Sequence, residues 1–150
     1  MRVTADVDSD DAEELLEDIR ERMRDFRPVW KHAKRELEKS FSENFLTGGS
    51  LVGGWAPLDA GYAAWKSVRR PMAPILIFDG KLFNSLRSLD KAAVNKIEKL
   101  EATFGTDVEY AQFHQYGTTK MPQRKIIFEP RGFASDLSRK SRNYVIRGKI

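Results

Sequence analysis

The stretch EYAQFHQYGTTKMPQRKIIF, residues 109–128, carries the strongest conformational signals in the chain. Its first half predicts a short helix that ends at Gly117, because glycine is the residue most often found just after a helix. Pro122 then fixes the direction in which the chain leaves the turn. The run KIIF at 125–128 is β-branched and predicts a short strand. Residues 109–128 are therefore predicted to form a helix–turn–strand corner.

The side chains of this corner suit a structural role. His114 and Gln115 both donate and accept hydrogen bonds, so they can satisfy carbonyls and amides of the loop around the turn. Arg124 carries a planar fork of donors that can pin the following segment. The three aromatic residues of the helix recur at three-residue steps and are predicted to pack, partly buried, on one helical face. We predict a structural motif made of Tyr110, His114, Gln115, Gly117, Pro122 and Arg124.

Catalytic and metal chemistry find little support in the sequence. As a general base, His114 would need a nucleophile or a positioned water, and no serine or threonine occupies an elbow-like turn. Neither histidine has acids around it at metal-ligand spacing. The chain has no cysteine, which excludes disulfides, thiolate zinc sites and cysteine nucleophiles. We expect no enzymatic activity, no metal and no cofactor, with an acid–base hydrolase centred on His114 as an alternative.

A long amphipathic helix is predicted at the N-terminus. Apolar residues recur at three- and four-residue steps over residues 12–45 and form one continuous stripe. Asp10 predicts the N-cap of this helix. Pro28 removes one backbone hydrogen bond without changing the phase of the stripe. We therefore expect either a helix kinked at Pro28 or two helices joined near residue 27.

A glycine-rich segment, LTGGSLVGGWAPL at 46–58, follows the helix. Four glycines within seven residues give the backbone wide conformational freedom, so we expect a mobile loop over 47–56. The loop is either a plain connector or a docking loop that becomes ordered against a partner, with Trp55 as its anchor. The candidate assembly contacts are Gly48, Gly49, Gly53, Gly54 and Trp55.

The rest of the chain predicts a single α+β domain. AGYAAWKSV at 60–68 indicates one or two helical turns, and KIEKLEATFG at 96–105 alternates imperfectly, as a strand does. The C-terminal residues predict either a basic helix or a last strand. We expect the long helix to pack on a small, mainly antiparallel sheet with short helices. Within this domain of residues 1–150, residues 1–8 are expected to be flexible and 129–150 to form a basic C-terminal segment.

The chain has a net charge of +4, but its charged residues are distributed unevenly along the sequence. Residues 1–25 contain ten acids and four arginines, whereas residues 120–150 contain nine basic and two acidic residues. Ends of opposite sign suit head-to-tail contacts between copies of one protein. The alternative is a nucleic-acid-binding module that uses the basic C-terminal segment, with Phe133 and Tyr144 available for stacking. The apolar runs are short and no charged-then-apolar leader opens the chain, so we expect a soluble, unsecreted protein.

Four motifs occur together in one order. YAQFHQYG and MPQRKIIF resemble the signature of the virion morphogenesis, or tail completion, proteins of tailed bacteriophages: Tyr-Ala, His-Gln-x-Gly, a short loop, then Pro-x-Arg and an apolar strand. GGWAPL at 53–58 resembles the Trp-x-Pro-Leu segment of that family. ILIFDGKLFNSL resembles its Ile-Leu and Gly-x-Leu-x-x-Ser pattern, with Gly80, Leu82 and Ser85 in the matching positions. The resemblance covers residues 37–128.

This resemblance implies a structural protein that acts late in virion assembly, at the tail end or at the neck where tail meets head. It implies rings of copies and contacts with other virion proteins, such as tail tube, tail terminator, neck or portal-adaptor proteins. The expected location is the virion, with host cytoplasm during assembly. We expect no membrane contact and at most weak contact with DNA.

Overall fold

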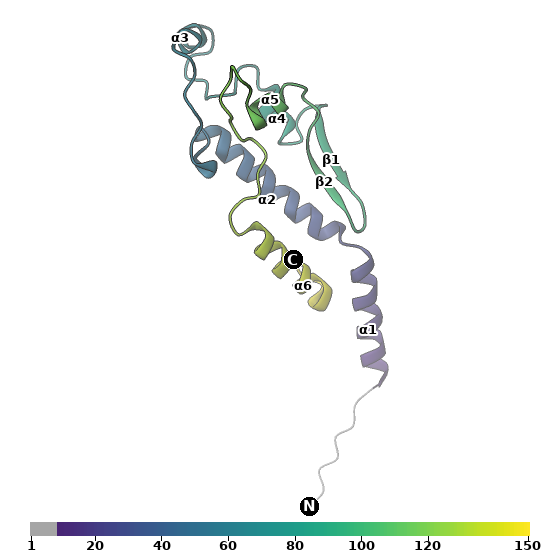
Figure 1. Cartoon of the computed structure of the whole chain (residues 1–150). Coiled ribbons are helices and arrows are strands. Elements are labelled where there is room, and N and C mark those ends of the chain that lie inside the picture. The colour runs from purple at the N-terminus through teal and green to yellow at the C-terminus, as the bar shows by residue number, and fades with distance from the viewer. Residues whose placement is uncertain (1–8) are drawn as a thin grey trace, which may run out of the picture.

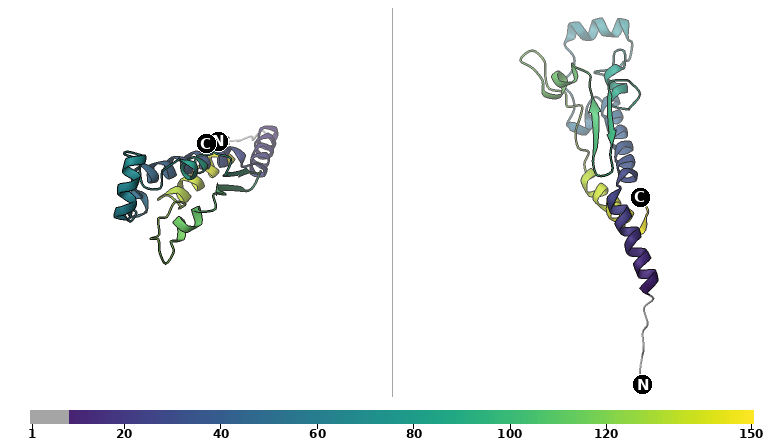
Figure 2. Two further views of the ribbon diagram at one scale, coloured as in Figure 1. Left: turned by 90° about the horizontal axis from the view of Figure 1, so that it is seen from above. Right: turned by 90° about the vertical axis from the view of Figure 1, so that its right-hand side faces the viewer.

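Helices dominate the described residues, 9–150, in the computed structural model. The elements are α1 (Ser9–Arg24), α2 (Arg27–Leu46), the 3₁₀ helix η1 (Ser50–Val52), α3 (Ala60–Arg69), α4 (Lys81–Ser85), β1 (Ala93–Ile97), β2 (Ala102–Thr106), α5 (Ala111–Tyr116) and α6 (Phe133–Arg147). The molecule is elongated: α2 runs along its middle, and α1 and α3 lie at opposite ends (Figures 1 and 2). The predicted α+β class is confirmed. The flexibility predicted for residues 1–8 lies outside the described residues.

The long N-terminal helix is divided in two at Asp25 and Phe26. Pro28 lies in the first turn of α2, where its missing N–H leaves no hydrogen bond unmade. The carboxylate of Asp25 accepts hydrogen bonds from the backbone N of Arg27 at 3.1 Å and from its Nε at 2.8 Å. The side-chain bond from Arg27 is the main reason that the pKa of Asp25 falls to about 2. Of the two predicted arrangements, two helices joined near residue 27 is confirmed.

The predicted apolar stripe is buried along α2 but not along α1. No residue of α1 is buried, and Leu15, Leu16 and Met23 are all exposed. The helix begins at Ser9, so the predicted N-cap Asp10 lies in the acidic first turn instead. There its negative charge interacts favourably with the positive end of the helix dipole. α1 extends beyond the body of the protein, which explains why its half of the stripe contributes nothing to the core (Figure 1).

The sheet consists of one antiparallel hairpin within the described residues. Ala93 pairs with Thr106 at one end, and Ile97 pairs with Ala102 at the other. The predicted strand KIEKLEATFG therefore spans the turn, because β1 ends at Ile97 and β2 begins at Ala102. The alternation was imperfect because residues on either side of the turn belong to two different strands. The hairpin packs beside α2 and α4 (Figure 1).

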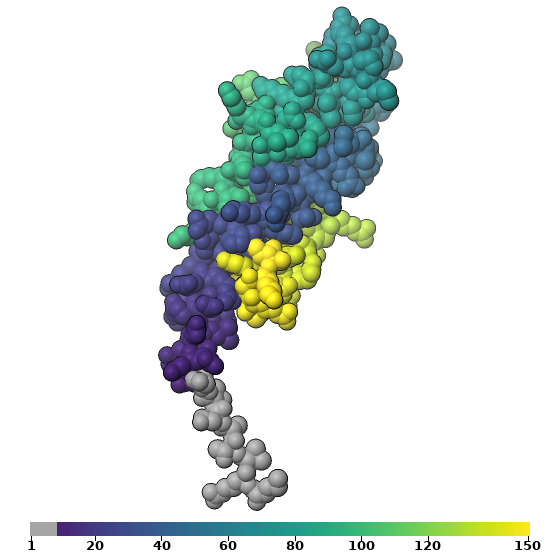
Figure 3. Space-filling view, turned by 180° about the vertical axis from the view of Figure 1, so that it is seen from behind, coloured from purple at the N-terminus to yellow at the C-terminus, as the bar shows by residue number. Residues whose placement is uncertain are grey.

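The C-terminal segment forms a helix, α6, which decides between the two predicted alternatives. α6 packs against α1 and α2 of the same chain (Figure 3). Tyr144 donates from its hydroxyl to the carbonyl of Asp25 at 3.0 Å, and its ring meets Phe26 edge-on at 6.1 Å. His32 Nε2 lies 3.2 Å from a carboxylate oxygen of Asp136. The C-terminal helix is thus joined to α2 by the His32–Asp136 pair and to the junction of α1 and α2 by Tyr144.

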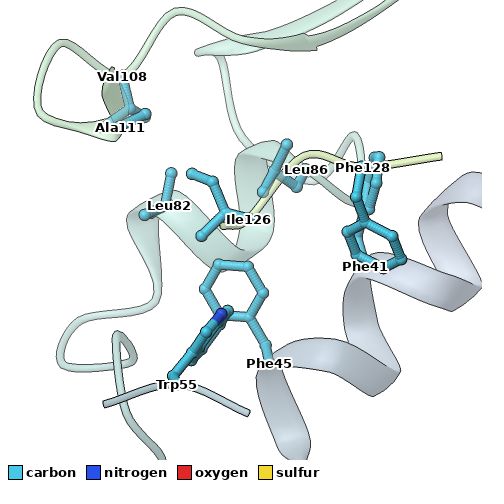
Figure 4. Close-up of a cluster of buried hydrophobic side chains, with 9 residues drawn as sticks. All are labelled: Phe41, Phe45, Trp55, Leu82, Leu86, Val108, Ala111, Ile126 and Phe128. Carbon is cyan, nitrogen blue, oxygen red and sulfur yellow. The ribbon is translucent and has the colours of Figure 1, made fainter. Parts of the chain in front are cut away.

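The core forms where α2, the glycine-rich loop, α4, α5 and residues 126–128 meet (Figure 4). Phe45 has no exposed surface and packs edge-on against Trp55, with ring centroids 5.2 Å apart. Phe41 packs edge-on against Phe128 at 5.6 Å. Such pairs add to the hydrophobic free energy of burial. The buried members are Phe41, Phe45, Trp55, Leu82, Leu86, Val108, Ala111, Ile126 and Phe128.

The glycine-rich loop folds back onto the end of α2. Gly49 N donates to Asn44 O, and Trp55 N donates to Gly48 O, both at 2.8 Å. A Cβ on Gly49 would lie 2.4 Å from the indole of Trp55, so only glycine fits there. Trp55 is buried and donates from Nε1 to Lys125 O at 3.0 Å. Its contacts are intramolecular, and the predicted role as anchor for a partner would require the indole to leave the core. The predicted mobility and glycine contacts with neighbours stay predictions.

Candidate functional site

The segment after Pro122 is held by a side chain rather than by a partner strand. The Oε1 atom of Gln115 accepts hydrogen bonds from Ile126 N and Ile127 N, each at 2.9 Å. Its Nε2 donates to Ile127 O at 2.8 Å. Burial still alternates along the segment as it would in a strand. The strand predicted at 125–128 is nevertheless wrong, because the amide of Gln115 takes the hydrogen bonds that a neighbouring strand would make.

Arg124 joins this corner to the segment that precedes α3. Its Nε donates to Ala56 O at 2.9 Å, and its Nη2 donates to Pro57 O at 2.8 Å. Its backbone N donates to His114 O at 2.8 Å. The side chain is buried, and this burial lowers the pKa of the guanidinium, which nevertheless stays charged in proteins. The guanidinium thus binds the carbonyls of Ala56 and Pro57, which precede it by 68 and 67 residues in the sequence.

The turn after α5 depends on a backbone conformation that glycine alone adopts readily. Gly117 has φ 74° and ψ 175°, and a Cβ there would lie 2.9 Å from Gln123 N and 3.1 Å from Met121 O. We expect Gly117→Ala to lower the free energy of unfolding by about 3 kcal/mol, from backbone strain plus this close approach. Urea denaturation monitored by circular dichroism measures the loss.

Gly53→Ala is the matched control for this substitution. Gly53 also has positive φ, 91°, but a Cβ there would have nothing within 4 Å. Gly53→Ala should therefore lower the free energy of unfolding only through backbone strain, by about 1 kcal/mol. Equal losses for the two variants would show that the close approach at Gly117 contributes nothing.

A pocket of about 540 Å³ opens between α3, residues 76–79 and the corner. One wall is aromatic: Tyr62 stacks on Trp65 with centroids 5.5 Å apart, and Trp65 stacks on Phe78 at 5.4 Å. Gln115 and Gly117 shape the corner without lining the pocket. The opposite wall includes four of the six predicted motif residues, Tyr110, His114, Pro122 and Arg124.

His114 contributes its ring to the pocket and its main chain to the corner. The imidazole meets Tyr110 edge-on, with centroids 6.0 Å apart. Its Nδ1 is buried and has no hydrogen-bond partner among the described residues, so the side-chain bonds predicted for the loop are not made by this atom. Burial, helped by the positive charge of Arg124, lowers the pKa of His114 below the usual 6.5. The imidazole is therefore neutral near pH 7.

The lowered pKa of His114 predicts that the fold loses stability on mild acidification. In unfolded chains this histidine has its ordinary pKa of 6.5 and takes up a proton at a higher pH than in the folded protein. The contribution of neutral His114 to the free energy of unfolding is therefore complete above pH 6.5. It is lost as the pH falls from 6.5 toward the pKa of His114 in the folded protein. Free energies of unfolding at about pH 7.5 and about pH 5.5 should differ less in His114→Gln than in the wild type. An identical difference in both proteins would contradict the assignment.

The four motifs seen in the sequence supply residues to this pocket and to the hydrophobic core. The corner supplies part of the lining, the Trp-x-Pro-Leu segment supplies Leu58, and ILIFDGKLFNSL supplies residues 76–79. Trp55, Leu82 and Ser85 of these motifs are buried instead. A sequence model of the phage virion morphogenesis family matches residues 7–144. The chain belongs to this family. No curated protein and no solved structure matches the chain significantly.

Family membership confirms the resemblance and gives this virion morphogenesis protein a structural role in virion assembly. The described residues contain no group of three or more side chains able to hold a metal ion. Among residues 9–150, no helix has the length and apolar character needed to cross a bilayer.

Sequence reasoning missed the aromatic wall of the virion morphogenesis protein. Tyr62 and Trp65 stand three residues apart on α3, a spacing that indicates one helical face, but nothing in the sequence pairs them with Phe78. Lys66 of the same helix is buried, and its Nζ donates to Pro74 O. Burial lowers the pKa of this amine.

The aromatic packing predicted for α5 is wrong for two of its three residues. Phe113 and Tyr116 are 48% and 77% exposed, and Ala111 is the buried residue of this helix. In this helix Ala111 faces the core, and the larger rings of Phe113 and Tyr116 face outward. Tyr110, just before the helix, lies at the pocket instead.

Proposed function

We propose that this protein acts late in virion assembly, at the tail end or the head–tail junction, as a tail completion or neck protein. It works through ordered self-assembly and through contacts with other virion proteins. Its place is the tail or neck of the particle, and it performs no catalysis.

The convergence of the four motifs supports this proposal. Segments that resemble tail completion proteins are scattered over residues 53–128, yet their residues meet in the corner, in the core and in the lining of one pocket. Gln115 and Arg124 hold the corner together through hydrogen bonds to backbone groups. Aromatic rings such as those of Tyr62, Trp65 and Phe78 at the pocket are enriched in the interfaces between proteins.

Deletion of the reading frame from its parent phage or prophage tests the proposal. After induction, electron microscopy of the lysate should show DNA-filled heads beside separate or malformed tails. Supplying the wild-type gene in trans should restore joined particles and infectivity. Normal infectious particles from the deletion strain would contradict an essential role at the tail or neck.

The nucleic-acid-binding alternative finds less support in the structure. Tyr144, one of its two stacking candidates, is committed to Phe26 and to the Asp25 carbonyl of its own chain. The basic helix α6 also lies against acidic α1, which would repel phosphates. A steep fall of DNA affinity with rising salt would revive this alternative.

A further inference from the structure

The N-terminal helix has an apolar face that residues 9–150 leave largely exposed. Leu15, Leu16 and Met23 are 52%, 61% and 56% exposed among the described residues. α6 reaches only the C-terminal end of α1, where Arg22 Nη1 donates to Val145 O at 2.9 Å. A helix gains most of its stability in proteins by burying its apolar face. The uncovered face of α1 therefore indicates a contact with another chain.

A complementary surface lies at the other end of the molecule. The pocket wall of Tyr62, Trp65 and Phe78 presents stacked aromatic rings, of which all three are partly exposed. Arg69 lies over the Trp65 ring at 4.4 Å, and Arg70 lies over the Phe78 ring at 5.3 Å. An apolar pocket bordered by arginines can accept an amphipathic helix whose borders are acidic.

The charge of α1 matches this requirement. Ser9–Arg24 contains seven acids and three arginines, and these charges border the leucines. Two acids, Asp59 and Asp79, also line the pocket. Five basic residues offset them: Lys66, Lys120 and Arg124 in the lining, and Arg69 and Arg70 over the aromatic rings. The charged groups at the pocket are therefore mainly basic.

α1 and α3 lie at opposite ends of the elongated chain, so α1 cannot reach the pocket of its own subunit (Figures 1 and 2). We propose that the apolar face of α1 docks in the aromatic pocket of a second copy of this chain. The contact joins two different surfaces, so repetition produces either a closed ring or a filament. This proposal rests on the self-assembly stated under the proposed function and names the surfaces that carry it.

Single cysteines test the contact, because the natural chain contains none. Leu16→Cys places a thiol on the apolar face of α1, and Met121→Cys places one in the pocket lining. Mixing the two full-length variants under mild oxidation should give a mixed disulfide dimer. Glu21→Cys lies on the opposite face of α1, and Val68→Cys lies on α3 outside the pocket lining. The pairs Glu21→Cys with Met121→Cys and Leu16→Cys with Val68→Cys are the controls and should not cross-link.

Sedimentation of the same chain gives an independent readout. Leu16→Asp should weaken self-association about tenfold or more, whereas Glu21→Gln should leave it unchanged. Leu16 is exposed, so circular dichroism should show both variants folded. A wild type that stays monomeric at all concentrations, or cross-links that form equally in all pairs or in none, would overturn the proposal. The deletion phenotype would be unaffected by that result, which separates failure of this contact from failure of the proposed function.

Discussion

Gln115→Leu is expected to lower the free energy of unfolding by about 3–5 kcal/mol. The substitution removes the amide that bonds Ile126 N, Ile127 N and Ile127 O, and it leaves these three backbone groups without their partners. Each such group costs about 1–3 kcal/mol when it is buried, and partial access of water reduces the sum. Chemical denaturation of the full chain measures the difference.

Two further variants make this prediction specific. Gln112→Leu changes an exposed glutamine of the same helix, whose Nε2 reaches only the nearby Glu109 O, and should cost less than about 1 kcal/mol. Gln115→Glu keeps the acceptor for Ile126 N and Ile127 N but loses the donor to Ile127 O, so its loss should be intermediate. If Gln115→Leu costs no more than Gln112→Leu, the segment after Pro122 is held by something other than this amide.

Trp55→Ala is expected to destabilise the protein by about 3–5 kcal/mol, a large share of the total stability of a typical domain. The substitution empties the space beside Phe45 and Gly49 and removes the hydrogen bond to Lys125 O. The glycine-rich loop would lose its attachment to the core. Thermal and urea denaturation should both show the loss.

The other variants of tryptophan separate packing from partner binding. Trp65→Ala, on a ring that is 42% exposed at the pocket, should cost about 1 kcal/mol and should instead weaken self-association. Trp55→Phe keeps an aromatic ring and loses the Nε1 donor, so its cost should lie between those of Trp55→Ala and the wild type. A fully stable Trp55→Ala protein that no longer assembles would instead support the predicted role of Trp55 as an anchor for a partner.

Local signals in the sequence predicted the helices well and the strands poorly. Gly117 and Pro28 mark a helix end and a helix start through their own backbone geometry, so their effects can be read without tertiary contacts. The run at 125–128 has the composition and the alternating burial of a strand. Its hydrogen bonds go to Gln115, and composition does not reveal which group will supply a partner.

The candidate site was predicted only in part, because some of its contacts are local in sequence and others depend on the tertiary fold. The corner residues are close together in sequence, so Gln115 and Arg124 could be given structural roles before the fold was known. The aromatic wall depends on Trp65 meeting Phe78, which only the tertiary fold determines. The whole long helix was likewise expected to pack on the sheet, although Leu16 in α1 is 61% exposed.

The hydrogen bonds to the carbonyl of Lys125 limit the order in which the chain can fold. It accepts hydrogen bonds from Asn44 Nδ2 at 3.3 Å and from Trp55 Nε1 at 3.0 Å, across separations of 81 and 70 residues. During synthesis both donors leave the ribosome long before Lys125 exists, and Phe45 must wait equally long for Ile126. The nascent chain therefore keeps apolar surface open until the corner has emerged, and the core closes in a late, non-local step.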